Sequence, residues 1–247
     1  MMFSYPLKVT LIFFLIVFYY KYIKTAMIYC APKMVQYFKL ARYFPLDDIK
    51  GALELALIAF SHVVFCCLLL YFLPIQWPKF SIKWSVLPIF FIYGCLLGIG
   101  CMGVSGLCCK LAVQIMGSFN KNAHYGLKTW LTVGRGGWIK HHLQSIEIFP
   151  IYLSLLILTM QVGSEEIIFR GILLNYFMPF GKMISFMTAL IFFVGMQAFL
   201  MNRWQSAIFP MIGAAVMGFI HSILYLEVPV IWPLIVAHVT FFLFSVL

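Results

Sequence analysis

Long apolar runs dominate this sequence and restrict the folds that it can adopt. Seven such runs recur along the 247 residues, each near or above the ~18 residues that a helix needs to cross a bilayer. They cover residues 5–20, 52–73, 86–116, 148–177, 183–201, 207–225 and 230–247. Because the runs lack the alternation of membrane β-strands, we predict an all-α fold, a multi-pass transmembrane helical bundle of about seven spans.

The few charged residues agree with a membrane location. They make up 10% of the chain, against ~25% in soluble domains, and the formal net charge is +10. The basic residues gather in alternate loops, a pattern that sets orientation and attracts anionic lipid. It places the first, third and fifth loops in the cytoplasm and the amino terminus outside. We expect a multi-pass protein in the plasma membrane of a bacterium, in contact with the lipid bilayer and with no nucleic-acid partner.

Two segments and the cysteines lead to further predictions. Residues 34–44 place aromatic and apolar side chains on one helical face and Lys39 and Arg42 on the other, which predicts a helix lying in the membrane interface. Residues 117–145 are polar and predict a flexible loop. The seven cysteines are odd in number and form no C-x-x-C pair, so they predict neither a disulfide framework nor a zinc site.

Ionisable side chains inside apolar spans are costly, and they usually face the bundle interior or a wet cavity. Such positions, together with one neutral amide, are Glu54, His62, Glu165, Glu166, Arg170, Gln197, His221 and His238. Glu54 and His62 share one run, and we expect them to form structural hydrogen bonds between helices. A histidine–glutamate metal site is the competing interpretation, but the sequence has no H-E-x-x-H helix. We therefore predict no metal and no cofactor.

The densest polar group is "EEIIFR", residues 165–170. On an α-helix, residues four apart lie ~40° apart around the axis and residues five apart lie ~140° apart. Glu166 and Arg170 are therefore neighbours, with the acid on the favourable N-terminal side, whereas Glu165 points elsewhere. One carboxylate is neutralised and the other is available for proton transfer. A buried ion-pair cluster that only fixes helix packing is the alternative.

These residues resemble the E-E-x-x-x-R motif of the CAAX-protease and bacteriocin-processing family of intramembrane glutamic endopeptidases. "FVGMQ", residues 193–197, stands where that family has F-x-x-x-H, and "HVTFF", residues 238–242, stands where it has H-x-x-x-N. The order and spacing agree, and the resemblance covers about residues 146–247. It implies a CAAX-protease-like membrane core over residues 146–247, preceded by N-terminal membrane helices with basic cytoplasmic loops over residues 1–145.

The resemblance also implies roles for individual residues. Glu165 would be the base that activates water, Glu166 and Arg170 would orient it, and His238 would stabilise the oxyanion or position the water. Gln197 would contribute a neutral amide donor at the position of the family's second histidine.

Two residues depart from the family pattern. Gln197 replaces a histidine and cannot carry a charge, and Phe242 replaces an asparagine and offers no polar group. His221, at a depth similar to that of His238, could compensate, although its helix differs from the family pattern.

The predicted function is therefore an intramembrane endopeptidase of CAAX-protease type. Its substrate and partner would be a small peptide or the tail of a membrane-anchored protein. The alternative is a catalytically silent relative that binds a membrane partner, such as a sensor kinase or a peptide exporter. A transporter with Glu165 and His238 as proton sites is the third interpretation, and it lacks support because no inverted repeat is evident. Nothing in the sequence indicates an oligomeric state.

Overall fold

The part of the chain that the structure describes is built from helices. The computed structural model describes residues 4–73, 75, 86–119, 138–200 and 204–246. In chain order the elements are α1 (Tyr5–Val17), η1 (Phe18–Ile23), α2 (Lys24–Tyr37), η2 (Leu40–Arg42), α3 (Leu46–Phe72), α4 (Leu87–Phe119), α6 (Trp138–Ile148), α7 (Ile151–Glu166), η4 (Ile167–Leu174), α8 (Asn175–Phe177), η5 (Met178–Phe180), α9 (Lys182–Leu200), α10 (Trp204–Glu227) and α11 (Trp232–Val246). Of these, η1 and η4 are π-helical. The predicted all-α fold class is confirmed.

The helices are long and apolar enough for a membrane protein. Within the described ranges, a helix lies at each of the seven predicted spans. Five helices have the length and hydropathy to cross a bilayer, namely Tyr5–Tyr37, Leu46–Phe72, Leu87–Ser118, Ile151–Phe180 and Ala207–Glu227. Lys182–Ala198 and Trp232–Ser245 are shorter apolar helices. Because helices satisfy their own backbone hydrogen bonds, they are suited to lipid, and the chain is a multi-pass integral membrane protein.

Local sequence explains where α3 and α7 begin. Pro45 and Pro150 directly precede these helices, and proline is tolerated at a helix start because the N–H groups there have no partner within the helix. Asp47 and Asp48 lie in the first turn of α3, where carboxylates interact favourably with the helix dipole. The starts of the two helices are thus set by short-range interactions.

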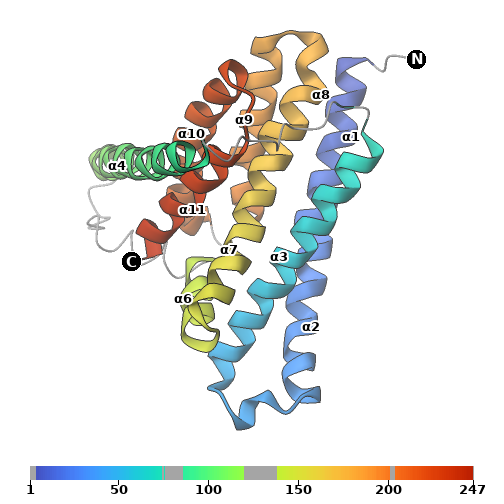
Figure 1. The fold of residues 1–247 in the computed structure, drawn as a ribbon, viewed down its shortest axis with the longest axis vertical. Coiled ribbons are helices and arrows are strands. Elements are labelled where there is room, and N and C mark those ends of the chain that lie inside the picture. Colours follow the sequence, from blue (N-terminus) through green and yellow to red (C-terminus); the bar gives the residue numbers. More distant parts are fainter. Residues whose placement is uncertain (1–3, 74, 76–85, 120–137, 201–203, 247) are drawn as a thin grey trace.

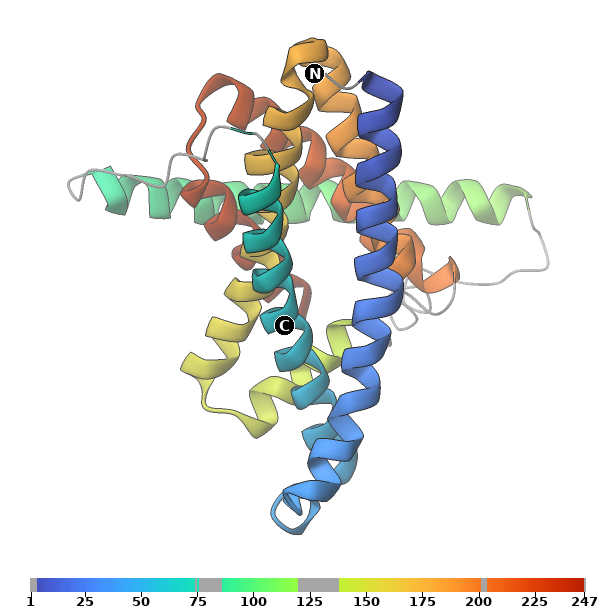
Figure 2. The same ribbon diagram turned by 90° about the vertical axis from the view of Figure 1, so that its right-hand side faces the viewer.

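The helices surround a central polar region. α1, η1 and α2 form one continuous helix beside α3, and α3 packs against α7 (Figure 1). α4 crosses these long helices (Figure 2) and packs against α10 and α11. The apolar core includes the buried rings of Phe169, Phe177 and Phe193. The carboxylates at the end of α7 therefore lie inside the bundle instead of facing lipid.

Two glycines allow α4 and α11 to approach closely. A Cβ atom on Gly94 would lie 2.7 Å from the carbonyl oxygen of Pro233, and a Cβ atom on Gly98 would overlap the carbonyl oxygen of Ala237. Small residues allow such close packing between membrane helices. Since Ala237 directly precedes His238, the contact at Gly98 helps to set the position of that histidine.

Two local expectations differ from the structure. Residues 34–44 do not form one interfacial helix, because α2 ends at Tyr37 and Lys39 adopts a left-handed conformation with φ 54°. A left-handed residue cannot continue a right-handed helix. The predicted loop at residues 117–145 is helical at both ends, since α4 continues to Phe119 and α6 begins at Trp138. Residues 120–137 lie outside the described residues.

Candidate active site

The acidic motif lies at the junction between an α-helix and a π-helical segment. Glu165 and Glu166 end α7, and Arg170 lies in the π-helical segment η4 that follows without a break. Nη1 of Arg170 donates a hydrogen bond to Oε1 of Glu166 at 3.3 Å, and both side chains are buried. This confirms the prediction that Arg170 pairs with Glu166. π-helical turns within α-helices occur frequently at functional sites.

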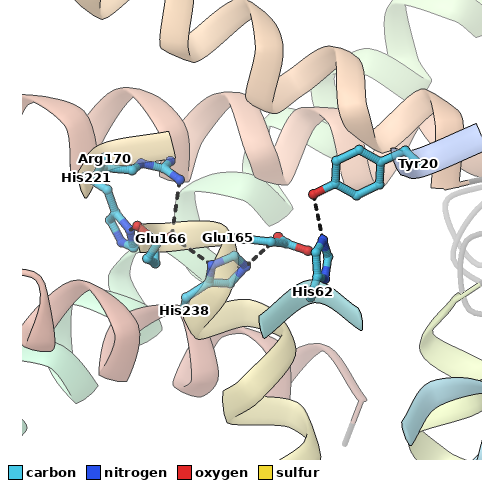
Figure 3. A network of polar contacts seen from close by, with 7 residues as sticks. All are labelled: Tyr20, His62, Glu165, Glu166, Arg170, His221 and His238. Atoms are coloured by element: carbon cyan, nitrogen blue, oxygen red, sulfur yellow. Dashed lines mark hydrogen bonds and ion pairs between the residues drawn. The ribbon is translucent and has the colours of Figure 1, made fainter. Parts of the chain in front are cut away.

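Glu166 is contacted from three sides (Figure 3). In addition to Arg170, Nδ1 of His238 lies 2.8 Å from Oε1 of Glu166, and Nδ1 of His221 lies 3.2 Å from Oε2. His221 comes from α10 and His238 from α11. The hydrogen bond between His238 and the charged Glu166 is short and orients both partners, whereas the two atoms of the His221 contact are close but do not meet hydrogen-bond geometry. Glu166 therefore holds three helices together and fixes the orientation of His238.

Glu165 lies on the opposite side of the His238 ring. Its Oε2 atom is 3.9 Å from Nε2 of His238, a distance too long for a direct hydrogen bond. None of the hydrogen bonds among the described residues involves its carboxyl group. In Figure 3 this group points away from Glu166 and toward Tyr20 and His62. The Glu165 carboxyl group is thus buried, but it can still accept a hydrogen bond from water or substrate.

The two carboxylates define the hydrogen-bonding state of His238. A carboxylate only accepts hydrogen bonds, so the 2.8 Å contact with Glu166 places a proton on Nδ1 of His238. In the neutral ring, Nε2 then presents a lone pair toward Glu165. One water molecule can donate a proton to each of two acceptors that are 3.9 Å apart. Oε2 of Glu165 and Nε2 of His238 are therefore two neighbouring acceptors to which a water molecule can donate.

The second motif contributes an aromatic side chain to this site. The ring centroid of Phe193 lies 4.0 Å from Cζ of Arg170 and 6.1 Å from the ring centroid of His238. A guanidinium over an aromatic face is favourable. Gln197 lies one helical turn further along α9 and is partly exposed. It forms no hydrogen bond or ion pair with the residues that the structure describes, so its catalytic role stays a prediction.

The third motif ends in an apolar contact. The ring centroids of Phe242 and His142 are 4.4 Å apart, and both residues line a small apolar pocket with Ser154. Burial lowers the pKa of His142 to about 3, so its ring is neutral at neutral pH. Phe242 therefore packs α11 against α6 and adds no polar group to the surroundings of Glu165.

Two polar groups reach this region from outside the motifs. His221 contacts Glu166; sequence analysis considered it only as compensation for the missing polar residues, and no motif assigns it a role. Tyr20 is a residue that sequence analysis missed, and its hydroxyl lies 2.7 Å from Nε2 of His62. The adjacent tyrosines 19 and 20 in an apolar run are the signal that could have identified it, because a buried phenol usually needs a hydrogen-bond partner. The bond also agrees with the expected inter-helix hydrogen bond of His62.

The histidines and carboxylates around Glu166 raise the question of a metal site. Among the described residues, no group of three or more histidine, cysteine or acidic side chains could hold a metal ion. His221 and His238 both direct Nδ1 to Glu166. The arrangement of these residues suits proton transfer between water, Glu165 and His238.

The carboxyl-terminal part of the chain matches one known family. Residues 147–244 match the model of the family described as type II CAAX prenyl endopeptidase Rce1-like. The match begins four residues before α7 and includes both carboxylates, Arg170 and His238. A comparison with curated proteins found no match, and a comparison with solved structures found none either.

Proposed function

We propose that this chain, whose residues 147–244 match the model of the Rce1-like type II CAAX prenyl endopeptidase family, cleaves peptide bonds within the membrane by means of a water molecule activated by Glu165. The substrate is a small peptide or the tail of a membrane-anchored protein. The observation that carries this proposal is the unequal environment of two adjacent buried carboxylates. Glu166 contacts Arg170, His221 and His238, whereas Glu165 faces only Nε2 of His238 at 3.9 Å among these groups.

In the proposed reaction, Glu165 transfers the proton and Glu166 has a supporting role. The attacking water donates one proton to Glu165 and hydrogen-bonds Nε2 of His238 with the other. Its oxygen forms a bond to the substrate carbonyl carbon as the first proton passes to Glu165, and the carbonyl becomes an oxyanion. When the C–N bond breaks, Glu165 returns the proton to the leaving amine, so water is divided between the two products. A positioned general base of this kind typically contributes 10²–10⁴-fold in rate.

Glu166 and Arg170 have a supporting role in this proposal. The Glu166 carboxylate accepts the Nδ1 proton of His238, which keeps the Nε2 lone pair directed at the water. Arg170 neutralises Glu166 inside the bundle, where an unpaired charge would be costly. The pair therefore supports catalysis through the position of His238.

A catalytically silent relative that binds a membrane partner is the second candidate. The observation in its favour is that Gln197 and Phe242, which replace polar family residues, supply no polar contact to the site. The two candidates differ in whether Glu165 is required, and one set of variants distinguishes them.

The test uses purified protein in lipid nanodiscs and a farnesylated, internally quenched peptide with a CAAX carboxyl terminus. We expect the parent to cleave it and Glu165→Gln to lower the rate at least ~10²-fold, because the base is lost while the side-chain shape is kept. Glu147→Gln, the same change on an exposed residue of α6, should cleave like the parent. Equal cleavage by the parent and Glu165→Gln would refute Glu165 as the base.

A complementation experiment in cells tests the alternative that the protein is a catalytically silent relative. A deletion strain is complemented with Glu165→Ala, and membrane-associated peptides are compared by mass spectrometry. Loss of complementation together with loss of a cleaved product is the expected result. Full complementation by Glu165→Ala would exclude the protease function and leave partner binding.

The same assays examine Gln197. If its amide donates to the oxyanion, Gln197→Ala should lower turnover by about 10²–10³-fold, and Gln197→His should be tolerated. Turnover that is unchanged in Gln197→Ala would show that the second motif no longer supplies a donor.

A further inference from the structure

A second buried polar pair lies beside the carboxylates, on helices that precede the family match. The hydroxyl of Tyr20, in η1, lies 2.7 Å from Nε2 of His62, in α3. Tyr20 is 1% exposed and His62 is 0% exposed. Nδ1 of His62 is buried and has no hydrogen-bond partner among the described residues. One ring nitrogen of His62 is thus held by Tyr20, and the other is a buried polar atom that is unpaired within the described part of the chain.

This pair faces the carboxyl group of Glu165. Figure 3 shows Glu165 between His238 on one side and the Tyr20–His62 pair on the other, with one carboxyl oxygen directed at His238 and the other on the side of the pair. The helices agree with this placement, because α3 packs directly against α7.

We propose that His62 is a further catalytic residue, whose Nδ1–H donates a hydrogen bond to the oxyanion that forms when the Glu165 water attacks, and that Tyr20 is the positioning residue that holds its ring. This inference rests on the proposed function of Glu165. Residues 20 and 62 both lie outside the matched range 147–244. The N-terminal helices therefore supply part of the catalytic machinery in addition to their contacts with lipid.

The hydrogen bond between the two side chains is compatible with the tautomer that this role requires. A phenol can donate to Nε2 of His62, and the neutral ring then carries its proton on Nδ1. The His62 ring, which would carry this Nδ1–H donor, lies on the side of Glu165 that His238 does not occupy. His62 supplies a neutral donor from outside the three motifs, whereas Gln197, which is partly exposed, forms no polar contact with the described residues. Preorganised donors to a developing oxyanion are among the largest contributions to catalysis.

A neighbouring pair of hydrogen-bonded residues, Tyr19 and Ser61, provides a control that distinguishes a catalytic role of the Tyr20–His62 pair from simple helix packing. The hydroxyl of Tyr19 lies 2.8 Å from Oγ of Ser61, and the Tyr19 ring stacks on the rings of Phe65 and His62, stacking contacts that Tyr19→Phe retains. This bond joins the same two helices one residue earlier and involves no imidazole. Tyr19→Phe and Tyr20→Phe each remove one buried phenolic hydroxyl and keep the ring, so they form a matched pair of variants.

The kinetic test compares these variants in nanodiscs with the farnesylated quenched peptide. We expect Tyr20→Phe to lower kcat by about tenfold with little change in KM, and His62→Asn to lower kcat by about 10²–10³-fold, the typical effect of losing one oxyanion donor. Tyr19→Phe should keep the kcat of the parent, although its melting temperature should fall about as far as that of Tyr20→Phe. Equal kcat values for Tyr19→Phe and Tyr20→Phe would overturn the inference.

A second measurement needs no turnover. In protein labelled with ¹⁵N-histidine, Glu165→Gln should shift the ring-nitrogen resonances of His62, which are assigned with His62→Asn, whereas Glu147→Gln should leave them unchanged. An unshifted His62 would refute the shared site even if Glu165 proves to be the base. Absence of cleavage by the parent, in contrast, would refute the proposed function, and the catalytic role of His62 would fall with it.

Discussion

Replacing Glu166 with glutamine removes the carboxylate that pairs with Arg170 inside the bundle. The Arg170 side chain is 1% exposed, and its Nη1 donates to Glu166 at 3.3 Å. Breaking a buried ion pair by removing one partner typically costs about 3–5 kcal/mol, because a charge is left uncompensated. The hydrogen bond from His238 also loses its charged acceptor, an effect that overlaps with the first and is not added to it. We therefore expect Glu166→Gln to lower the free energy of unfolding by about 3–5 kcal/mol.

Glu165→Gln is the matched control, since it makes the same chemical change one residue earlier. Glu165 has no salt-bridge partner closer than 3.9 Å among the described residues, so its loss leaves no charge uncompensated. By the scale of soluble domains of this size, the loss for Glu166→Gln corresponds to a fall in melting temperature of roughly 6–20 °C. Size-exclusion chromatography of the solubilised protein after heating would measure this fall. Equal melting temperatures for the two variants would refute the division between a structural and a catalytic carboxylate.

Two further predictions concern packing and topology. Gly98→Val should destabilise the solubilised protein by about 1–3 kcal/mol, because its side chain would overlap the α11 backbone. Gly100→Ala, where no atom lies within 4 Å of the added Cβ, should melt like the parent, and equal melting of both variants would contradict the close contact. A reporter enzyme fused after Arg42 or Arg135 should be active in the cytoplasm, and one fused after Lys79 should be active outside, because basic loops remain inside. A cytoplasmic signal at all three positions would refute this orientation.

The fold class followed from the sequence because lipid restricts the choice of structures. Helices occur at each of the predicted spans, since a run of apolar residues in a bilayer has few alternatives to a helix. Boundaries were harder to predict. The first span continues to Tyr37, beyond the apolar run, because the helix persists through polar residues such as Lys21 and Lys24. The break at Lys39 depends on one left-handed residue, which composition does not indicate.

The site was predictable where its residues share one helix. The pairing of Glu166 with Arg170 follows from spacing alone, and the structure has it at 3.3 Å. Contacts between helices do not follow from spacing. The contact of His221 with Glu166 and the bond between Tyr20 and His62 join residues 55 and 42 positions apart in the sequence, and they depend on how the helices cross.

The central claim, that Glu165 activates water without forming a bond to the substrate, can be tested by isotope incorporation in a single turnover. Excess enzyme cleaves the farnesylated peptide in H₂¹⁸O, and mass spectrometry follows both the product and the enzyme peptide that contains Glu165. Direct attack by water predicts one ¹⁸O atom in the new carboxyl group of the product and none in Glu165. Incorporation of ¹⁸O into Glu165, with none in the product, would show a covalent intermediate and would contradict the proposed role of Glu165 as a base.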